Sequence, residues 1–413
     1  MAEKVDVAVV GGGMAGATLA WALYRRGLEV ALIEPGEPPE PAYEEAPLRV
    51  SAINAGSRAI LADLGLWEDI AAQGAAPIGT IEVTDGHRRG RTLLDCREAG
   101  VEALGHVVSN RAVVATAWER IRAEGGATLL QPARMESMER GPDRTRITVE
   151  SGGERFTLEA RLVVGADGEH SGVRRAAGIG TWGWHHNRHA VVAVVDCERD
   201  LAGHAFERFL PEGPLAFLPL GGGRASIVWT LTPSAAAEVA ELGTADFLAR
   251  LRARFGPALG ALHDTGERAV FPLELRLAER FTGDRAALVA NAGHLVHPVA
   301  GQGFNLGLRD VAALAEELGN ARDRGWDPGN AAVLGRYERR RRMDTTRVVA
   351  FTEGLNRLFG NEAMPLAVAR RLGLAGLDRI GPLKRMLMNQ AMGRNPGRLP
   401  RSPFFPAIEE LRQ

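Results

Sequence analysis

The sequence contains very few cysteines and almost no net charge. Its 413 residues include only Cys96 and Cys197, which lie too far apart in sequence for a CxxC pair or a metal-binding spacing. We therefore expect no metal site and no disulfide framework, as in a protein of the reducing cytoplasm. The formal net charge is −1, so no global electrostatic field favours nucleic acid as a partner.

We also expect no membrane span and no secretory leader. Residues 7–24 and 286–308 contain no Asp, Glu, Lys or Arg, and each window is long enough to cross a bilayer. Glycines interrupt the first window and polar side chains the second, so each fits a buried strand that runs into a helix. A signal peptide has a basic segment before its apolar run, and no such segment precedes the first apolar run here.

The start of the chain predicts a strand, a glycine-rich loop, a helix and a second strand. The expected strands are 4–10 and 29–34, and the expected helix is 17–26. The loop has the pattern GxGxxG, and an acidic residue ends the second strand. In a dinucleotide-binding unit the glycines permit a tight turn, a close approach to pyrophosphate and helix–strand packing, while the acid binds ribose hydroxyls. These positions are Gly11, Gly13, Gly16 and Glu34.

Two alternatives apply to this fingerprint. A glycine-rich turn in an ordinary α/β protein has the same pattern, and Glu34 taken alone could be a solvated carboxylate at a strand end. The preceding strand, the following helix and the spacing of Glu34 favour a nucleotide. No second GxGxxG occurs, and residues 221–223 are predicted to be a hairpin turn. We therefore expect one resident dinucleotide, with any other bound transiently.

Two further loops follow apolar, strand-like runs. One is the Asp167-Gly168 turn, which is often no more than a turn, although Ser171 and Arg174 follow in register. The other is the segment 291–310, where a helix is expected to begin near Gly303. A helix N-terminus directs unpaired N–H groups and a positive dipole end to one point. Something negative or electron-rich should bind there, and the fingerprint upstream makes a flavin the expected guest.

The three motifs together resemble those of the class A flavoprotein aromatic hydroxylases. They are GxGxxG at 11–16, DGxxSxVR at 167–174 and HPxAGQGxNxGxxD at 297–310. Other segments resemble the ubiquinone-biosynthesis branch of that family, in particular hydroxylases of 2-polyprenylphenols. These segments are 48–54, 64–67, 105–110 and 390–393, and the resemblance runs from about residue 4 to about residue 395.

The resemblance implies an α/β fold with a Rossmann-like FAD-binding domain of the para-hydroxybenzoate hydroxylase type, an inserted β-sheet substrate domain and a helical C-terminus. The domain boundaries are suggested by changes along the chain between alternating strand and helix patterns, mainly strand-like patterns and mainly helical patterns. The expected FAD-binding domain is 1–75, 98–180 and 278–331, the substrate domain 76–97 and 181–277, and the C-terminal helical region 332–413. Within these domains we expect helices at 48–66 after Arg49, at 110–124 with Asn110 as its cap, and at 235–255, and a hairpin at 145–164.

The resemblance also implies roles for particular residues. FAD and passing NAD(P)H are the expected cofactor and co-substrate. No catalytic base is identified, and the expected reaction site is the flavin-ring loop Pro298, Gly301, Gln302 and Gly303. The implied cofactor-binding residues are Gly11, Gly13, Gly16 and Glu34 at the ADP half, Arg49 and Arg111 nearby, Asp167 for FAD and NAD(P)H, Asn291 at the ribityl chain, and Pro298, Gly301, Gly303 and Asn305 at the ring.

The chain departs from the family at the start of its third motif. Ala290-Asn291-Ala292-Gly293-His294 stands where the family usually has Gly-Asp-Ala-Ala-His. Asn keeps an acceptor for a ribityl hydroxyl but loses the charge, which we interpret as tuning of FAD binding. His294 and His297 are expected to be structural, since no carboxylate or cysteine lies at metal spacing.

Two clusters allow two interpretations each. His185, His186 and His189 predict either a surface loop between domains or an edge of the substrate cavity. The arginines at 336 and 339–342 predict the solvated face of a helix, or, with Lys384, Arg385 and the apolar residues 386–388, a surface for anionic lipid.

The sequence thus predicts an FAD monooxygenase that uses NAD(P)H and O2 to hydroxylate a polyprenylated phenol in ubiquinone biosynthesis. An oxidase or reductase of another lipid, and a flavin-poor subunit that organises other biosynthetic enzymes, are the alternatives. The expected location is cytoplasmic. Peripheral contact with the inner membrane, homo-oligomer formation and association with other ubiquinone-biosynthesis enzymes are left open.

Overall fold

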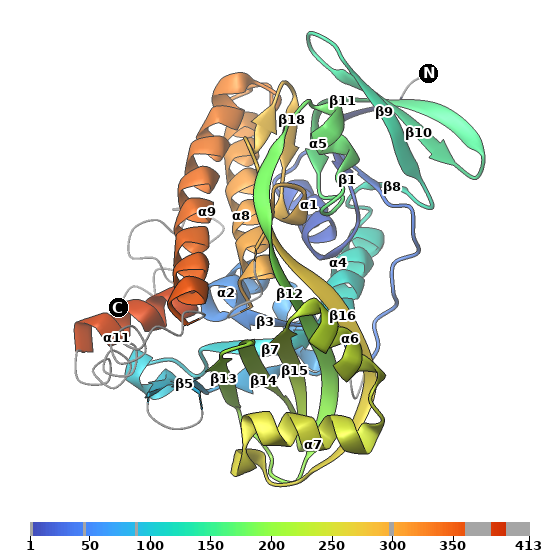
Figure 1. Cartoon of the computed structure of the whole chain (residues 1–413). Coiled ribbons are helices and arrows are strands. Elements are labelled where there is room, and N and C mark those ends of the chain that lie inside the picture. The colour runs from blue at the N-terminus through green and yellow to red at the C-terminus, as the bar shows by residue number, and fades with distance from the viewer. Residues whose placement is uncertain (1–2, 44–46, 87–89, 297–300, 360–380, 394–413) are drawn as a thin grey trace.

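The computed structural model describes residues 3–43, 47–86, 90–296, 301–359 and 381–393. Two large sheets lie one above the other in Figure 1, linked by the long strands β12 (Thr181–Cys197) and β16 (Leu262–Ala278). Two long helices flank the upper sheet (Figure 1), α8 (Gln302–Asp323) and α9 (Ala331–Phe359). This architecture confirms the predicted fold class.

The upper sheet is built around the predicted βαβ unit and has the order β17-β18-β11-β1-β2-β8. Its inner strands pair in parallel and are buried on both faces, which explains their nearly continuous apolar sequences. An antiparallel arm of β9 and β10 extends from β11 (Figure 1). The strands are β1 Glu3–Val10, β2 Val30–Ile33, β8 Thr128–Leu130, β9 Arg134–Arg140, β10 Thr145–Ser151, β11 Glu154–Gly165, β17 Thr282–Gly283 and β18 Ala286–Leu288.

The register of the upper sheet brings three loops to one edge. Val10 at the end of β1 pairs with Gly165 at the end of β11, and Gly165 pairs with Leu288 at the end of β18. Because these strands are parallel, their carboxyl ends lie side by side, the usual ligand edge of such a sheet. The fingerprint, the Asp-Gly turn and the 290–296 segment all begin there.

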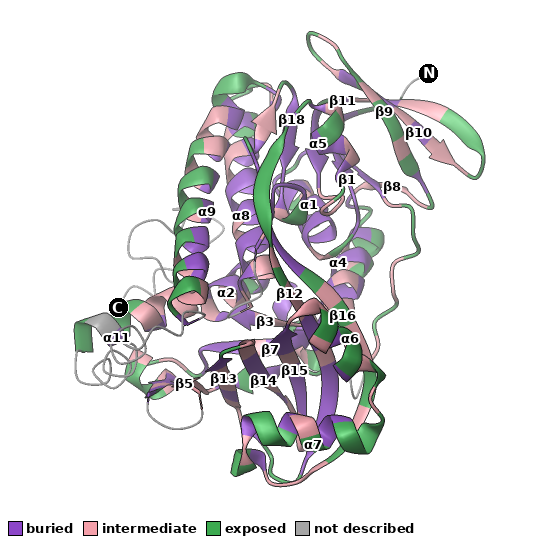
Figure 2. Cartoon of the chain, in the orientation of Figure 1, coloured by how far each residue is buried: buried purple, intermediate pink, exposed green. Residues whose placement is uncertain are grey.

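The lower sheet has the order β19-β16-β12-β15-β14-β13-β5-β6 and joins segments that are far apart in sequence. Its outer face packs on α6 and α7 around buried Trp229 and Phe247, whereas its inner face is turned towards the upper unit (Figures 1 and 2). The further elements are β5 Thr80–Asp85, β6 Arg91–Asp95, β13 His204–Leu210, β14 Gly213–Gly221, β15 Arg224–Leu231, β19 His294–Leu295, α6 Pro233–Glu241 and α7 Thr244–Phe255.

A small third sheet connects the two large ones, with the order β3-β7-β4. Helices α1 and α4 cover the upper sheet, and α5 follows β11. The bounds are β3 Val50–Asn54, β4 Ala76–Ile78, β7 Gly105–Ser109, α1 Met14–Arg25, α2 Ala55–Asp63, α3 Trp67–Ala72, α4 Asn110–Glu124, α5 Gly172–Ala176 and α11 Gly381–Ala391, with short 3-10 helices at Cys96–Ala99, Pro257–Leu259 and Ala290–Ala292.

Three local predictions were wrong. Residues 50–54 form a strand that pairs with β7, because antiparallel pairing overrides a pattern that also suits a helix. Ser109, not Asn110, precedes α4, and the Asn110 side chain instead accepts a hydrogen bond from Ser51 Oγ at 2.7 Å. The expected helix 235–255 is two helices, which separate near Gly243.

Helix α11 packs against the β6 edge of the lower sheet rather than lying free. Met388 and Met392 are buried against Leu94 of β6 and Leu104. Lys384 pairs with Glu98 at 2.8 Å, and Gly56 donates its N–H to the Met392 carbonyl at 2.9 Å. Of the apolar cluster 386–388, Met386 alone is strongly exposed. The basic and apolar residues of α11 are therefore used mainly for internal packing.

We keep the division into the three predicted domains as a proposal.

Candidate active site

The glycines of the fingerprint have distinct geometric roles. A Cβ atom at Gly16 would stand 1.8 Å from the Gly11 carbonyl oxygen, so only glycine lets α1 approach β1. Gly11 has φ +100°, and a Cβ atom there would stand 2.5 Å from the Ala166 oxygen. Gly13 meets nothing within 4 Å and precedes α1 without a side-chain cap, so the helix N-terminus is open to a ligand.

Glu34 lies directly beside this loop. One carboxylate oxygen accepts the Gly12 N–H at 2.6 Å, and the other accepts the Gly36 N–H at 2.9 Å. Trp118 of α4 donates its indole N–H to the Gly12 carbonyl at 2.8 Å. Glu34 is therefore held at the predicted ribose position by the loop itself, which fits the dinucleotide interpretation better than a free surface carboxylate does.

Asp167 forms the second part of the site. Its Oδ2 accepts the backbone N–H groups of Gly172 and Val173, at 2.7 and 3.2 Å, while Oδ1 is buried with no partner in the described part of the chain. Arg174, which is buried, donates to the carbonyl of Ala292 at 2.8 Å. The second motif is thus attached to the third, and one carboxylate oxygen is left for a ligand.

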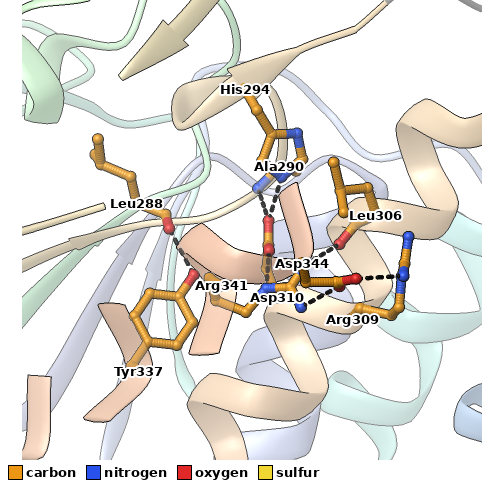
Figure 3. Close-up of polar contacts among 9 residues, drawn as sticks. All are labelled: Leu288, Ala290, His294, Leu306, Arg309, Asp310, Tyr337, Arg341 and Asp344. Carbon is orange, nitrogen blue, oxygen red and sulfur yellow. Dashed lines mark hydrogen bonds and ion pairs between the residues drawn. The ribbon is translucent and has the colours of Figure 1, made fainter. Parts of the chain in front are cut away.

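The third motif is organised by the buried Asp310 of α8 (Figure 3). Its carboxylate accepts hydrogen bonds from the Ala290 N–H at 2.8 Å, His294 Nε2 at 2.6 Å and Arg341 Nε at 2.5 Å. Burial opposes ionisation of Asp310, but His294, Arg341 and these hydrogen bonds outweigh it and hold its pKa below the usual range. Arg341 belongs to α9 and links that helix to α8, and Asp344 of α9 also pairs with Arg341, at 2.6 Å.

This network explains the histidine and corrects one prediction. His294 is 1% exposed and serves as a structural partner of Asp310, as expected, whereas His297 lies outside the described residues. Arg341, expected on a solvated face, has a side chain only 3% exposed. Arg336 and Arg340 pair with Glu317 and Glu316 of α8, and Arg339 and Arg342 are exposed. The arginine run therefore has an inner and an outer face.

The N-terminus of α8 follows the loop that the sequence predicted to lie beside the flavin ring. Gly301 has φ +61° and precedes α8 without a side-chain cap, and Gly303 has open space where a Cβ atom would be. Asn305 is 1% exposed and donates to the carbonyls of Ala52 and Gly301, at 2.8 and 2.6 Å. Asn305 therefore fixes the loop against β3, and its predicted contact with the ring remains a prediction. Pro298 lies outside the described residues.

A cavity of about 900 Å³ lies between the two large sheets. Its upper wall contains Gly13, Ala166, Gly168, Ala290, Asn291 and residues 301–304. Its lower wall is the inner face of the lower sheet, with Val83, Glu207, Ala216 and Val228, and α9 and α11 close one side with Phe351, Leu355, Leu387 and Ala391. The cavity thus reaches from all three motifs to the predicted substrate sheet.

Several predicted site residues lie away from this cavity. Arg49 and Arg111 do not line it: the Arg49 guanidinium lies 5.6 Å from the Phe271 ring, and Arg111 Nε donates to the Glu40 carbonyl at 3.1 Å. His185, His186 and His189 lie on β12, so neither the loop nor the cavity-edge interpretation of them holds. His185 and His186 instead face Glu274 and Glu353, at 3.2 and 3.3 Å.

Glu207 is a site residue that the sequence did not reveal. It is the only ionisable side chain among the described residues that line the cavity, and its burial raises its pKa to about 7. The alternation of Ala205, Glu207 and Phe209 along β13 is the signal that could have found it. The sequence does not show which strands lie beside β13, and without them a glutamate in such a strand is predicted to face solvent.

The residues present fit an FAD molecule. The open Gly13 cradle and Glu34 suit the ADP half, and the unpartnered Asp167 Oδ1 offers an acceptor. The exposed Asn291 amide on the cavity wall is placed for a ribityl hydroxyl, and the uncapped α8 N-terminus favours an electron-rich ring edge. Among the described residues, no group of three His, Cys, Asp or Glu side chains could hold a metal.

Comparison with known proteins agrees with this geometry. The FAD binding domain family matches residues 4–352. A ubiquinone hydroxylase UbiL of Rhodospirillum rubrum is 43% identical over 95% of this chain and 90% of its own. The 3-demethoxyubiquinol 3-hydroxylase of Escherichia coli is 35% identical over 95% of this chain and 99% of its own. A mitochondrial ubiquinone biosynthesis monooxygenase COQ6 of Rattus norvegicus is 30% identical over 93% of this chain and 90% of its own.

Solved structures show the same fold. The p-nitrophenol 4-monooxygenase PnpA of Pseudomonas putida superposes with a TM-score of 0.78 at 20% identity, over 96% of this chain and all of the other. PqsL of Pseudomonas aeruginosa superposes with a TM-score of 0.74 at 24% identity, over 90% of this chain and 99% of its own. The matched family, the relatives and the three converging motifs lead to one conclusion: the chain belongs to the FAD-dependent aromatic hydroxylases, in the branch that serves ubiquinone biosynthesis, and is a flavoprotein monooxygenase.

Proposed function

We propose that this monooxygenase hydroxylates the aromatic ring of a polyprenylated phenol, with NAD(P)H and O2 as co-substrates. The observation that carries the proposal is the cavity of about 900 Å³, whose wall is apolar apart from a few polar groups and which runs from the flavin-side motifs to α9 and α11. Such a cavity suits a phenol ring that carries an isoprenoid tail. The named functions of the relatives from Rhodospirillum rubrum and Escherichia coli support the same substrate class.

FAD, when bound, supplies the redox chemistry: it is reduced by NAD(P)H and lets one oxygen atom of O2 pass to the ring while the other leaves as water. The chain contributes binding, orientation and exclusion of water. Gly303 has open space where a Cβ atom would be and would leave room for the ring, and the α8 N-terminus would stabilise negative charge on it. We propose that NAD(P)H binds transiently, since the chain carries one GxGxxG fingerprint.

The side with α9 and α11 is the proposed path for the lipid tail. Leu355 and Leu387 line the cavity there, while Leu358 and Met386 expose 38% and 59% of their surface.

No helix within the described residues is long and apolar enough to cross a membrane. We propose peripheral contact with a lipid surface through this side. Flotation of the protein with anionic liposomes should weaken in an Arg385→Glu, Met386→Glu variant, and unchanged flotation would contradict the contact.

Two measurements test the proposed reaction. Profiling of quinone intermediates in a strain that lacks the protein should reveal a precursor without one ring hydroxyl, restored by the intact gene. A flavin absorbance spectrum of the purified protein tests the alternative of a flavin-poor organising subunit, which the left-handed Ala290 and the uncharged Asn291 favour. Protein that stays colourless after incubation with excess FAD would contradict the enzyme proposal.

A further inference from the structure

Glu207 is placed on the substrate side of the cavity by the pleat of β13. Ala205, Glu207 and Phe209 alternate along the strand, and all three line the cavity. In the sheet register, Glu207 lies opposite Val83 of β5 on one side and Ala216 of β14 on the other. The row continues to Val228 of β15, which pairs with Ala216. A single carboxyl group thus stands in a row of aliphatic side chains.

No described protein group neutralises this carboxyl. Glu207 has no hydrogen-bond or ion-pair partner within the described residues, and burial is the one cause that raises its pKa to about 7. Glu207 is half-buried, so its carboxyl faces the cavity, where an ionised group in an apolar wall is unfavourable unless a polar ligand or water solvates it. The group therefore points to a ligand with a polar, proton-bearing atom at this place.

The neighbouring charges are engaged elsewhere. On β5, Glu82 pairs with Arg91 at 2.9 Å and with His204 at 3.7 Å, and Asp85 lies at the strand end opposite Phe209. On β13, Arg208 donates to the Phe255 carbonyl of α7, on the outer face. Strand β14 carries no ionisable side chain, and on α9 Glu353 faces His186 at 3.3 Å. None of these groups lines the cavity.

We propose that Glu207 binds the phenolic hydroxyl of the substrate and accepts its proton during hydroxylation. This inference rests on the proposed function. The phenol O–H bond breaks and a carboxyl O–H bond forms, so the ring becomes a more electron-rich phenolate and is oxygenated more readily. After oxygen transfer the ring carbon loses its hydrogen as a proton, which ends in the water that forms from the second oxygen atom, and Glu207 returns the borrowed proton to the phenolate oxygen. The carboxyl titrates near neutral pH, as an efficient acid–base group should.

The test compares wild type with Glu207→Gln, which keeps the size of the side chain but cannot accept a proton. Glu82→Gln is the matched control, because Glu82 lies on the adjacent strand, outside the cavity wall. A phenol with a short isoprenoid tail is titrated into the FAD-loaded proteins without NAD(P)H, and binding is followed by the flavin absorbance. The methyl ether of the same phenol, which has no proton to give, serves as the second ligand.

Wild type and Glu82→Gln should bind the phenol about 10-fold more tightly as the pH rises through about 7, because an ionised acceptor is the stronger one. Glu207→Gln should lose this pH dependence, and the methyl ether should bind all three proteins alike. In turnover, Glu207→Gln should lower kcat by roughly 100-fold or more, as for loss of an acid–base group, while KM should change by no more than the roughly 10-fold difference in binding. Glu207→Asp should recover part of both effects, and it serves as the folded variant if Glu207→Gln fails to fold.

The two proposals fail in different ways. If wild type hydroxylates the phenol, and Glu207→Gln has the same pH profile of binding and the same kcat, the role of Glu207 is wrong and the function stands. If the pH-dependent binding is present and lost in Glu207→Gln, but no product forms, the role in recognition stands and the hydroxylase proposal fails. Absence of phenol binding by wild type at every pH would overturn the inference.

Discussion

The carboxylate of Asp310 accepts a hydrogen bond from the backbone N–H of Ala290 at 2.8 Å and holds that residue at φ +51°. The same carboxylate binds His294 and Arg341, so one buried side chain ties the 290–296 segment to α8 and α9. Ala290 and Asn291 face the cavity. The flavin-side wall of the site therefore depends on an ion-pair network behind it.

Replacement of Asp310 by Asn should destabilise the protein by about 3–5 kcal/mol, because it leaves the buried Arg341 without its main counter-charge. Chemical denaturation measures this change, and the flavin content after purification should fall with it. Asp323→Asn is the control, since that side chain is 58% exposed in its pair with Arg26 and should change stability by less than about 1 kcal/mol. Equal stability of the two variants would contradict the role of Asp310.

The pH dependence of the network follows from the same pair. The folded-state pKa of Asp310 is held below its value in the unfolded chain, near 3.8. Its contribution to stability is therefore fully present above that value and is lost as the pH falls through the lower folded-state pKa. Wild type should lose more stability than Asp310→Asn as the pH is lowered below about 4, which thermal unfolding across the acid range measures.

Ala290→Gly should stabilise the protein by about 1 kcal/mol, because an alanine in the left-handed region is strained and glycine is not. The variant also restores the residue usual in the family and should retain FAD at least as well. Ala292→Gly provides the contrast: Ala292 is buried and is not among the left-handed residues, so its truncation should destabilise. Destabilisation by both changes would show that the Ala290 conformation carries no strain.

Two fingerprint glycines should respond differently to alanine. Gly16→Ala places a Cβ atom 1.8 Å from the Gly11 oxygen and should disrupt folding of the βαβ unit. Gly13→Ala meets no protein atom within 4 Å, so the protein should fold normally while FAD binding weakens. Circular dichroism and flavin content together separate these outcomes. Normal FAD binding by folded Gly13→Ala would contradict the position of the pyrophosphate.

Without a bound ligand, the stability of the protein should depend on the protonation state of Glu207. Its folded-state pKa is raised from 4.5 to about 7, so its contribution is fully present below the unfolded value and is lost as the pH rises through about 7. Glu207→Gln should therefore gain stability relative to wild type between about pH 5 and about pH 8, by up to roughly 1.4 kcal/mol for each pKa unit. A constant difference in melting temperature across this range would contradict the unpaired carboxyl in an apolar cavity wall.

The sequence predicted those parts of the site that are local in the chain. Gly11, Gly16 and Glu34 lie within one βαβ unit, where spacing alone predicts that they lie side by side, and their contacts with FAD stay a prediction. The functions of Asp310 and Arg341 depend on contact between two helices, and an arginine run carries no signal of which member turns inward. The strand 50–54 and the cavity position of Glu207 depend on sheet partners distant in sequence, which single-strand patterns do not reveal.

The most direct test of the central claim is the fate of molecular oxygen. The purified, FAD-loaded protein is incubated with NAD(P)H, isotopically labelled O2 and a phenol that carries a short isoprenoid tail, and the products are analysed by mass spectrometry. We predict a hydroxylated phenol that contains one labelled oxygen atom and forms only when the phenol is present. Consumption of NAD(P)H with release of labelled peroxide and no labelled phenol, or a reduced product without labelled oxygen, would contradict the account.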